Sequence, residues 1–321
     1  MNSPATAPAP LRASLGEMDA DSVAYMAMQP APPAVPPTPE MAREGMRRMR
    51  PINQPDLPHV AMVREYQVPG PGGPIPVRYY RAVGTLPDEA LPVQVYFHGG
   101  GWVIGDLDSH DWVCRAVANA AKCAVVSVDY RLAPEHCFPA AYDDALAAVQ
   151  WTAANARLLN IDPASISVGG DSAGGNLAAA VAVALRGSGP TKLRAQILTY
   201  PIVDLTWRYD ERFAEGVTLT NDGMRAFIEH YVPQLSERRD PRCSPLYAAT
   251  LKGLPPTLVI LAGFDPLYDE GEAYAARLKS EGVAVTVLRY PGQMHGFVSR
   301  PKLLPKSYDA IAGIAAFMNA H

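Results

Sequence analysis

Short apolar runs and longer amphipathic stretches follow one another along most of this chain of 321 residues. A short apolar run bounded by Gly, Pro or Asp predicts a buried strand, whereas helical spacing sustained over several turns predicts a helix. Eight strands are predicted in this way: His59–Val68, Ile75–Ala82, Val93–Phe97, Ala124–Asp129, Ser165–Gly169, Leu193–Tyr200, Thr257–Ala262 and Val283–Tyr290.

Helices are predicted in the intervals between many of these strands. The first two strands are joined by Pro69–Pro74, whose Pro and Gly content predicts a hairpin connection. After them strands and helices alternate, which is typical of a mostly parallel sheet with helices on both faces. The pattern therefore predicts an α/β fold with an eight-stranded sheet over residues 51–321. The predicted helices are His110–Lys122, Ala140–Asn155, Asn176–Leu185, Glu272–Glu281 and Ser307–Asn319.

The first 50 residues differ from the rest of the chain. Six prolines between positions 30 and 39 predict a stiff, extended segment. Thr38 and Pro39 are suited to the cap and the first position of a helix, which we expect to run through Met49. A shorter helix is expected around Asp19–Met28, where several apolar side chains would need a partner.

A second departure from the alternation lies between Pro201 and Pro255, where no core strand is predicted. Thr220 is suited to cap a helix over Gly223–Val232. Insertions of this length in a compact domain are usually functional, for example as lids. We therefore predict that residues 1–50 and an insertion at about 207–246 form one helical cap, which supplies most of the acyl pocket.

Composition narrows the class of protein. Hydrophobic residues make up 48% and charged residues 19% of the chain, and the formal net charge is −4. These values are typical of a folded globular domain. Because Lys and Arg are scattered rather than clustered, no nucleic-acid partner is expected.

Neither a secretory signal nor a membrane span is expected from the sequence. The longest uncharged apolar stretch, Ser172–Leu185, is too short to cross a bilayer. The four cysteines have no spacing typical of metal ligands, so free buried thiols are expected, which fits a reducing compartment. We therefore expect a cytoplasmic protein without a membrane partner.

The first candidate catalytic motif is Gly170–Gly175, which has the sequence Gly-Asp-Ser-Ala-Gly-Gly and lies between a predicted strand and a predicted helix. A serine between glycines at such a corner is the nucleophile-elbow pattern. The turn leaves no room for side chains at Gly170 and Gly174, so Ser172 projects at the start of a helix, where negative charge is favoured. Ser172 is therefore the candidate nucleophile, although a small-residue turn that only packs a helix would have the same pattern.

A serine nucleophile needs an imidazole as base and a carboxylate that fixes the imidazole's tautomer. At an elbow of this type the chain order is Ser, then Asp or Glu, then His. Three of the seven histidines follow Ser172. His321 is the last residue and His230 falls on the predicted cap helix. His295 follows the last predicted strand, at the edge where open α/β sheets bind ligands, and is the candidate base.

The carboxylate is expected just after the strand Thr257–Ala262. Asp265 falls beyond that strand's carboxyl end, level with the expected position of His295, and is the first candidate. Asp269 is the second candidate. Asp269 or Glu270 could instead cap the helix that follows, because acidic side chains are favoured there.

A third motif, His98-Gly99-Gly100-Gly101-Trp102, follows the strand Val93–Phe97. Adjacent glycines let bare backbone N–H groups approach a carbonyl oxygen, as an oxyanion hole requires. We expect the N–H groups of Gly100, Gly101 and Ala173 to stabilise the oxyanion, with His98 orienting the loop. A phosphate-binding interpretation fails because no dinucleotide glycine pattern or phosphate-loop lysine accompanies the glycines.

Together these motifs resemble those of the bacterial members of the hormone-sensitive-lipase family (family IV) of esterases, within the α/β-hydrolase superfamily. The likeness covers roughly residue 59 to the C-terminus as one domain. The matching stretches, in family order, are His98–Trp102, Asp129–Glu135, Gly170–Gly175, Asp265–Gly271 and His295–Phe297.

The resemblance implies that Ser172, Asp265 and His295 form a catalytic triad and that Asp129–Glu135 is part of the scaffold. It also implies that the N-terminal helices and the insertion after Pro201 form the cap, and that homodimers are common. The expected activity is that of a serine carboxylesterase acting on small-molecule esters with short to medium acyl chains, without a metal or organic cofactor.

Two alternatives remain open at this point. Because fold alone does not fix function, the first alternative is a non-catalytic, ligand-binding member of the same fold. Loss of a triad residue would support this alternative. An amide or lactone hydrolase would use the same residues and differ only in the leaving group.

Overall fold

One mixed sheet of eight strands forms the centre of the molecule. The computed structural model describes residues 16–29, 37–187, 189–207, 210–213 and 217–321. The strands lie in the order β1-β2-β4-β3-β5-β6-β7-β8. Their bounds are β1 Met62–Gly70, β2 Gly73–Arg81, β3 Leu91–Phe97, β4 Ala124–Val128, β5 Ile161–Asp171, β6 Leu193–Thr199, β7 Thr257–Phe264 and β8 Val285–Met294.

Six of the strands, β3 to β8, are parallel to one another, whereas β1 and β2 form an antiparallel hairpin at one edge and β2 pairs with β4 in the antiparallel sense. The hairpin is tighter than expected, because Gly70 already pairs with Gly73 and leaves only two residues in the turn. Strands β4 and β7 are buried along their whole length, as expected for strands covered on both faces.

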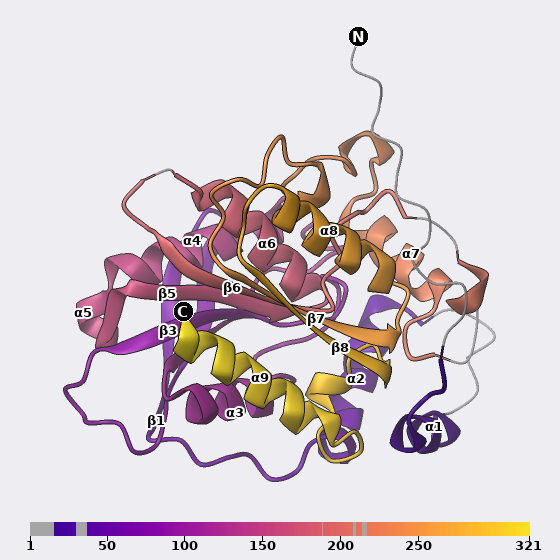
Figure 1. Ribbon diagram of the computed structural model, residues 1–321, viewed down its shortest axis with the longest axis horizontal. Coiled ribbons are helices and arrows are strands. Elements are labelled where there is room, and N and C mark those ends of the chain that lie inside the picture. Colours follow the sequence, from indigo (N-terminus) through magenta and orange to yellow (C-terminus); the bar gives the residue numbers. More distant parts are fainter. Residues whose placement is uncertain (1–15, 30–36, 188, 208–209, 214–216) are drawn as a thin grey trace.

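Helices cover both faces of this sheet, as the sequence predicted (Figure 1). One apolar core joins α4, α6 and α8 to the sheet, and a second core on the other face contains residues of α3 and α9. The helices are α1 Ala20–Ala27, α2 Pro39–Asn53, α3 Asp111–Ala121, α4 Ala140–Ala154, α5 Ala156–Leu159, α6 Ala173–Leu185, α7 Asn221–Tyr231, α8 Tyr268–Ser280 and α9 Lys306–Ala320. Short 3₁₀ turns lie at Glu211–Phe213, Leu235–Glu237, Pro245–Tyr247 and Phe297–Ser299.

The end of β8 differs from the expectation. The sequence predicted that the last strand ends at Tyr290, because Pro291 and Gly292 usually interrupt strands. The strand instead continues to Met294, which pairs with Phe264 across a shift in register. Gly263 makes this possible, since a Cβ atom there would lie 1.9 Å from the carbonyl oxygen of Pro291.

The two segments predicted as a cap contain the expected helices. Thr38 caps α2 by accepting a hydrogen bond from the Met41 amide at 3.3 Å, and Thr220 caps α7 by accepting one from the Gly223 amide at 3.2 Å. Helix α2 is four residues longer than predicted and contains Pro51 in its last turn. Within the described part of residues 201–256 no strand interrupts the connection between β6 and β7.

None of the four cysteines is in a disulfide: Cys114, Cys123 and Cys243 are buried, whereas Cys137 is only partly buried. Across the described ranges, no helix is both long enough and apolar enough to cross a membrane.

Candidate active site

The turn from β5 to α6 carries the candidate nucleophile. Ser172 has a φ of 57° and a ψ of −119°, a conformation that side chains rarely adopt. Its amide donates to the carbonyl oxygen of Thr199 on β6 at 2.9 Å. Gly174 passes so close to β3 that an added Cβ would lie 1.9 Å from the Phe97 carbonyl oxygen. Glycine is therefore required sterically at this corner, as the sequence predicted.

The structure brings Ser172, His295 and Asp265 into one hydrogen-bonded line. The Ser172 Oγ lies 2.9 Å from Nε2 of His295, and the His295 Nδ1 lies 2.6 Å from Oδ2 of Asp265. The three residues follow β5, β8 and β7, three parallel strands of which β7 and β8 are neighbours and β5 is separated from β7 by β6, so their carboxyl ends lie at one edge of the sheet. Positions 123 and 30 residues apart in the chain thereby become neighbours.

Hydrogen bonding fixes the tautomer of His295. A carboxylate only accepts, so Asp265 requires a proton on Nδ1 and leaves the lone pair of Nε2 directed at the Ser172 hydroxyl. Asp265 is fully buried, and its other oxygen accepts from the Leu267 amide at 2.9 Å. The backbone oxygen of His295 accepts from Thr218 Oγ1 at 2.8 Å and from Arg300 Nη1 at 3.0 Å. The backbone of His295 and the carboxylate that orients its ring are thus both held in place.

The second candidates are placed elsewhere. Asp269 pairs with Arg212 at 2.8 Å, and Glu270 accepts from the Val203 amide at 2.5 Å. Burial raises the pKa of Glu270 well above its usual value. Both carboxylates lie in the first turn of α8, where acidic side chains are favoured, but the position before the first residue of the helix is Leu267, so neither of them is its hydrogen-bonding cap. Their partners lie in the connection after β6 instead.

The other two histidines after Ser172 are also placed away from it. His230 lies near the end of α7, where its backbone oxygen accepts from Cys137. His321 lies at the chain end with its ring 4.6 Å from that of Phe317. Among the described histidines, His295 is the one within hydrogen-bonding distance of the Ser172 hydroxyl.

The glycine loop after β3 is a tight turn beside the nucleophile. Gly100 and Gly101 have φ values of 124° and 58°, and the Gly100 carbonyl accepts from the amides of Val103 and Ile104. In the part of the chain that the structure describes, no hydrogen bond uses the N–H groups of Gly100 and Gly101. Ala173 is the first residue of α6, so its N–H group has no carbonyl partner within the helix.

His98 has the orienting environment expected from the sequence. Its ring stacks on Tyr130 with the ring centres 4.3 Å apart, and its Nδ1 lies 2.8 Å from the Gly99 carbonyl oxygen. The Tyr130 hydroxyl donates to the backbone oxygen of His98 at 2.7 Å. Burial lowers the pKa of His98 to about 4, so the ring is neutral near pH 7 and donates to the loop that it precedes.

Asp171, next to the nucleophile, is a residue of the site that sequence reasoning missed. Its carboxylate is buried and accepts from Tyr96 Oη at 2.6 Å and from the Gly99 amide at 2.9 Å. Burial by itself raises the pKa of Asp171, but His110 and the Tyr96 hydroxyl outweigh it and hold the pKa at about 2. The signal in the sequence that could have indicated Asp171 is a charged residue at the end of an otherwise apolar strand.

Both predicted cap segments contact the loops of the site. The Phe227 ring of α7 packs on Gly101 so closely that an added Cβ would lie 2.2 Å from it. Asp19, at the start of α1, donates its amide to the Gly292 carbonyl oxygen at 2.9 Å, three residues before His295. Arg43 of α2 donates from Nε to the Val103 carbonyl oxygen at 2.7 Å. Each segment therefore reaches a loop that carries a candidate catalytic group.

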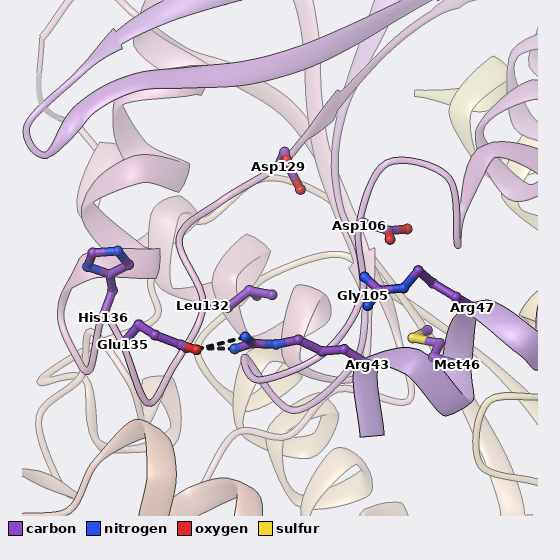
Figure 2. Close-up of a pocket in the computed structure, with 9 residues that line it drawn as sticks. All are labelled: Arg43, Met46, Arg47, Gly105, Asp106, Asp129, Leu132, Glu135 and His136. Atoms are coloured by element: carbon purple, nitrogen blue, oxygen red, sulfur yellow. Dashed lines mark hydrogen bonds and ion pairs between the residues drawn. The ribbon is translucent and has the colours of Figure 1, made fainter. Parts of the chain in front are cut away.

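A cavity of about 450 Å³ lies beside α2 (Figure 2). Arg43 crosses it to form a bidentate ion pair with Glu135, at 2.7 and 2.8 Å. Asp106 and Asp129 line the opposite side. Because none of the three triad residues lines it, this cavity is distinct from the space above Ser172.

Comparison with known proteins agrees with this geometry. Residues 94–299 match a family described as having the alpha/beta hydrolase fold. The carboxylic ester hydrolase LipN of Mycobacterium tuberculosis is 45% identical over 269 residues, which cover 81% of this chain and 70% of LipN. The carboxylesterase NlhH of the same organism is 40% identical over 88% of this chain and 89% of NlhH. A thermostable esterase from Pseudomonas putida superposes with a TM-score of 0.90 at 32% identity, covering 96% of this chain and 99% of that one.

The fold and the relatives thus define the class of protein: the chain belongs to the α/β-hydrolase fold family. The resemblance to hormone-sensitive-lipase esterases, drawn from five motifs, is confirmed by these relatives.

Proposed function

We propose that the chain is a serine carboxylesterase in which Ser172 is the nucleophile, His295 the general base and acid, and Asp265 the carboxylate that orients His295. Ester hydrolysis follows from the relatives, which are carboxylic ester hydrolases at 40 to 45% identity. The assignment of roles rests on one observation, the line of hydrogen bonds from the Ser172 hydroxyl through His295 to Asp265.

The reaction follows from that line. His295 Nε2 takes the proton from Ser172 as Oγ attacks the ester carbonyl carbon, and Asp265 stabilises the imidazolium that forms. The N–H groups of Gly100, Gly101 and Ala173 receive the oxyanion of the tetrahedral intermediate. His295 then protonates the leaving alcohol. Water, activated by the same imidazole, hydrolyses the acyl-enzyme and restores the Ser172 hydroxyl.

We further propose that residues 1–50 and about 207–246 act as the cap over this site. Support comes from the three contacts described above, which join α1, α2 and α7 to the catalytic loops. Phe227 supports a preference for short to medium acyl chains, because a partly buried aromatic ring directly over Gly101 limits the space beside the oxyanion. The substrates are accordingly small esters.

Two finer statements stay predictions. Four cysteines without a disulfide support a reducing compartment such as the cytoplasm. Homodimer formation is predicted from the resemblance alone, and sedimentation of the purified protein would test it.

The experiment that tests the proposed roles compares purified variants on a short aryl ester such as 4-nitrophenyl butyrate. Ser172→Ala and His295→Ala should each lower kcat by on the order of 10³-fold or more, because the nucleophile and its base act as a unit. His321→Ala and Ser280→Ala are matched controls at exposed positions outside the proposed cap and the candidate catalytic loops. Near-normal turnover by pure Ser172→Ala protein would end the assignment.

A further inference from the structure

The carboxylate of Asp171 lies directly behind the glycine loop. Its Oδ1 accepts from the Gly99 amide at 2.9 Å and from the Tyr96 hydroxyl at 2.6 Å. Gly99 and Asp171 are in such close contact that an added Cβ on Gly99 would lie 2.4 Å from Oδ2. Asp171, which precedes Ser172 and Ala173, is therefore hydrogen-bonded to Gly99, which precedes Gly100 and Gly101. The same carboxylate thus connects the two loops that carry the expected oxyanion donors.

His110 completes the environment of this carboxylate. Its Nε2 lies 3.2 Å from Oδ1 and 3.3 Å from Oδ2 of Asp171, and both side chains are almost wholly buried. Its Nδ1 lies 3.0 Å from Ser109 Oγ. The His98 ring lies 5.7 Å from the His110 ring between ring centres, and the Tyr96 ring lies 6.1 Å away.

The hydrogen-bond partners of His110 favour one protonation state. Ser109 Oγ lies 2.7 Å from the Asp106 carbonyl oxygen, which only accepts, so the single hydroxyl hydrogen is directed there. Towards His110 the hydroxyl can then only accept, which requires a proton on Nδ1. An ionised Asp171 likewise requires a proton on Nε2. With both nitrogens donating, His110 carries a positive charge.

A buried anion at this place would oppose the reaction unless it were neutralised. The oxyanion of the tetrahedral intermediate forms beside Gly100 and Gly101, next to the residue that Asp171 holds. An uncompensated carboxylate there would repel it strongly in a medium of low dielectric constant. The charge on His110 cancels that field while leaving the hydrogen bond to Gly99 intact.

We propose that Asp171 and His110 form a buried carboxylate–imidazolium pair that positions the oxyanion loop through the Gly99 amide and keeps its surroundings electrically neutral. Both are positioning residues, since they act through Gly99 rather than on the substrate. This inference rests on the proposed function, because it assigns the pair to the oxyanion hole of the Ser172 reaction.

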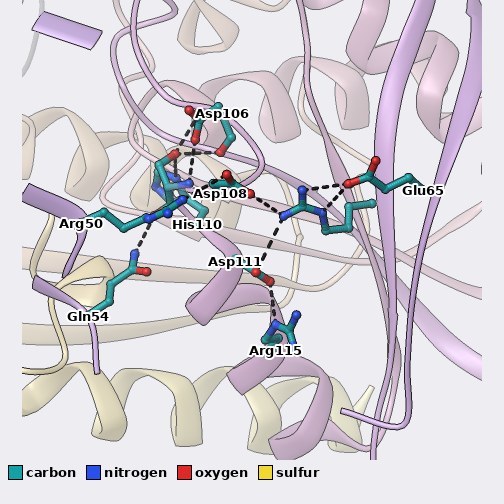
Figure 3. A network of polar contacts seen from close by, with 10 residues as sticks. Arg50, Gln54, Glu65, Asp106, Asp108, His110, Asp111 and Arg115 are labelled. Carbon is teal, nitrogen blue, oxygen red and sulfur yellow. Dashed lines mark hydrogen bonds and ion pairs between the residues drawn. The ribbon is translucent and has the colours of Figure 1, made fainter. Parts of the chain in front are cut away.

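His110 is also linked to the end of α2 (Figure 3). Gln54, which directly follows the last residue of α2, donates from Nε2 to the Ser109 carbonyl oxygen at 2.6 Å, and both residues are buried. Ser109 in turn contacts His110. A continuous set of hydrogen bonds therefore runs from α2 through Ser109 and His110 to Asp171.

The first test uses steady-state kinetics of Asp171→Asn and His110→Gln. Each should lower kcat by on the order of 10- to 100-fold with KM changed less than about threefold, because a misplaced oxyanion donor affects the transition state more than substrate binding. Affinity for a trifluoromethyl ketone, which forms a tetrahedral adduct on serine, should fall by the same factor. Inhibition by butyrate should be unchanged.

The double variant separates charge balance from simple damage. Asp171→Asn combined with His110→Gln should be less impaired than the product of the single effects, because neither buried charge is left unpaired. Asp144→Asn is the matched control: Asp144 is also fully buried and paired, with Arg131 at 2.8 Å, but on α4. It should lower thermal stability while leaving kcat at 25 °C within about twofold.

A measurement on the unaltered protein keeps the inference testable if the variants do not fold. In ¹⁵N NMR spectra of histidine side chains at pH 8, His110 should have the signature of an imidazolium with both nitrogens protonated. A neutral ring at His110 would overturn the inference. So would a folded Asp171→Asn protein with kcat within twofold of the parent while Ser172→Ala is inactive. Activity retained in Ser172→Ala would instead overturn the proposed function.

Discussion

Helices α6 and α2 have similar lengths but are held in opposite ways. Helix α6, which begins directly after the candidate nucleophile Ser172, has 11 buried residues among its 13. In α2, with 15 residues, none is buried against the parts of the chain that the structure describes. Burial of apolar surface therefore fixes α6, whereas α2 is held by polar side chains such as Arg43 and Gln54.

The difference in burial between α6 and α2 matches two different structural roles, the support of Ser172 and the attachment of the proposed cap. A nucleophile at a sterically demanding turn needs a rigid support, which close packing of Ala, Val and Leu against the sheet supplies. The proposed cap needs only enough attachment to keep its position. Hydrogen bonds and ion pairs at the surface supply this at a small gain in stability, since each contributes about 1 kcal/mol or less.

The largest expected effect comes from removing a core side chain of α6. Leu177 is fully buried. Leu177→Ala should lower the free energy of unfolding by about 2–5 kcal/mol, because it removes apolar contacts and leaves a cavity. Met41→Ala in α2 is the control, and a change within about 0.5 kcal/mol is expected because Met41 is 63% exposed. Urea unfolding followed by circular dichroism measures both, and equal losses would contradict the comparison.

A smaller effect, on activity rather than stability, is expected at Arg43. Its guanidinium bonds the Val103 and Ala133 carbonyl oxygens as well as Glu135, so it ties α2 to the end of the glycine loop. Arg43→Gln should lower kcat/KM by about 3- to 10-fold while changing the free energy of unfolding by about 1 kcal/mol or less.

Arg48→Gln is the matched control for this change, because exposed Arg48 pairs only with Glu44 of the same helix among the described residues. Its kcat/KM should stay within about 1.5-fold of the parent. A loss of activity in Arg48→Gln equal to that in Arg43→Gln would mean that the net charge of α2, and not the link to Val103, matters.

The smallest effect is expected at Phe227, the residue of the proposed cap that packs on Gly101. Phe227→Ala should shift the preferred acyl length of 4-nitrophenyl esters upward, with the ratio of octanoate to butyrate turnover rising about 2- to 10-fold. The reason is the space that the missing ring leaves beside the oxyanion loop. Arg225→Ala on the exposed side of α7 should leave the ratio unchanged. A falling ratio in Phe227→Ala would remove this residue from the acyl pocket.

The sheet and the three candidate catalytic side chains could be predicted because their signals are local. The glycines around Ser172, the strand before Asp265 and the loop position of His295 each mark a strand end, and parallel strands bring such ends together. The end of β8 could not be predicted, because it depends on Gly263 letting Pro291 pass beside another strand.

The contacts around the site could not be predicted from the sequence either, because they also join residues that are far apart in the chain. Asp171 pairs with His110, 61 residues away, and Thr218 bonds the backbone of His295 across 77 residues. Nothing in the sequence close to Asp171 or His295 indicates these partners. Asp269 and Glu270 had the local pattern of helix caps, yet packing against the connection after β6 gave them other partners.

Covalent labelling tests the central assignment most directly. The protein is treated with one equivalent of a fluorophosphonate, residual hydrolysis of 4-nitrophenyl butyrate is followed in time, and the modified peptide is identified by mass spectrometry. If Ser172 is the nucleophile, activity falls in proportion to a single adduct on Ser172. Full activity in protein whose Ser172 is completely modified, or inactivation that accompanies an adduct on another residue, would contradict it.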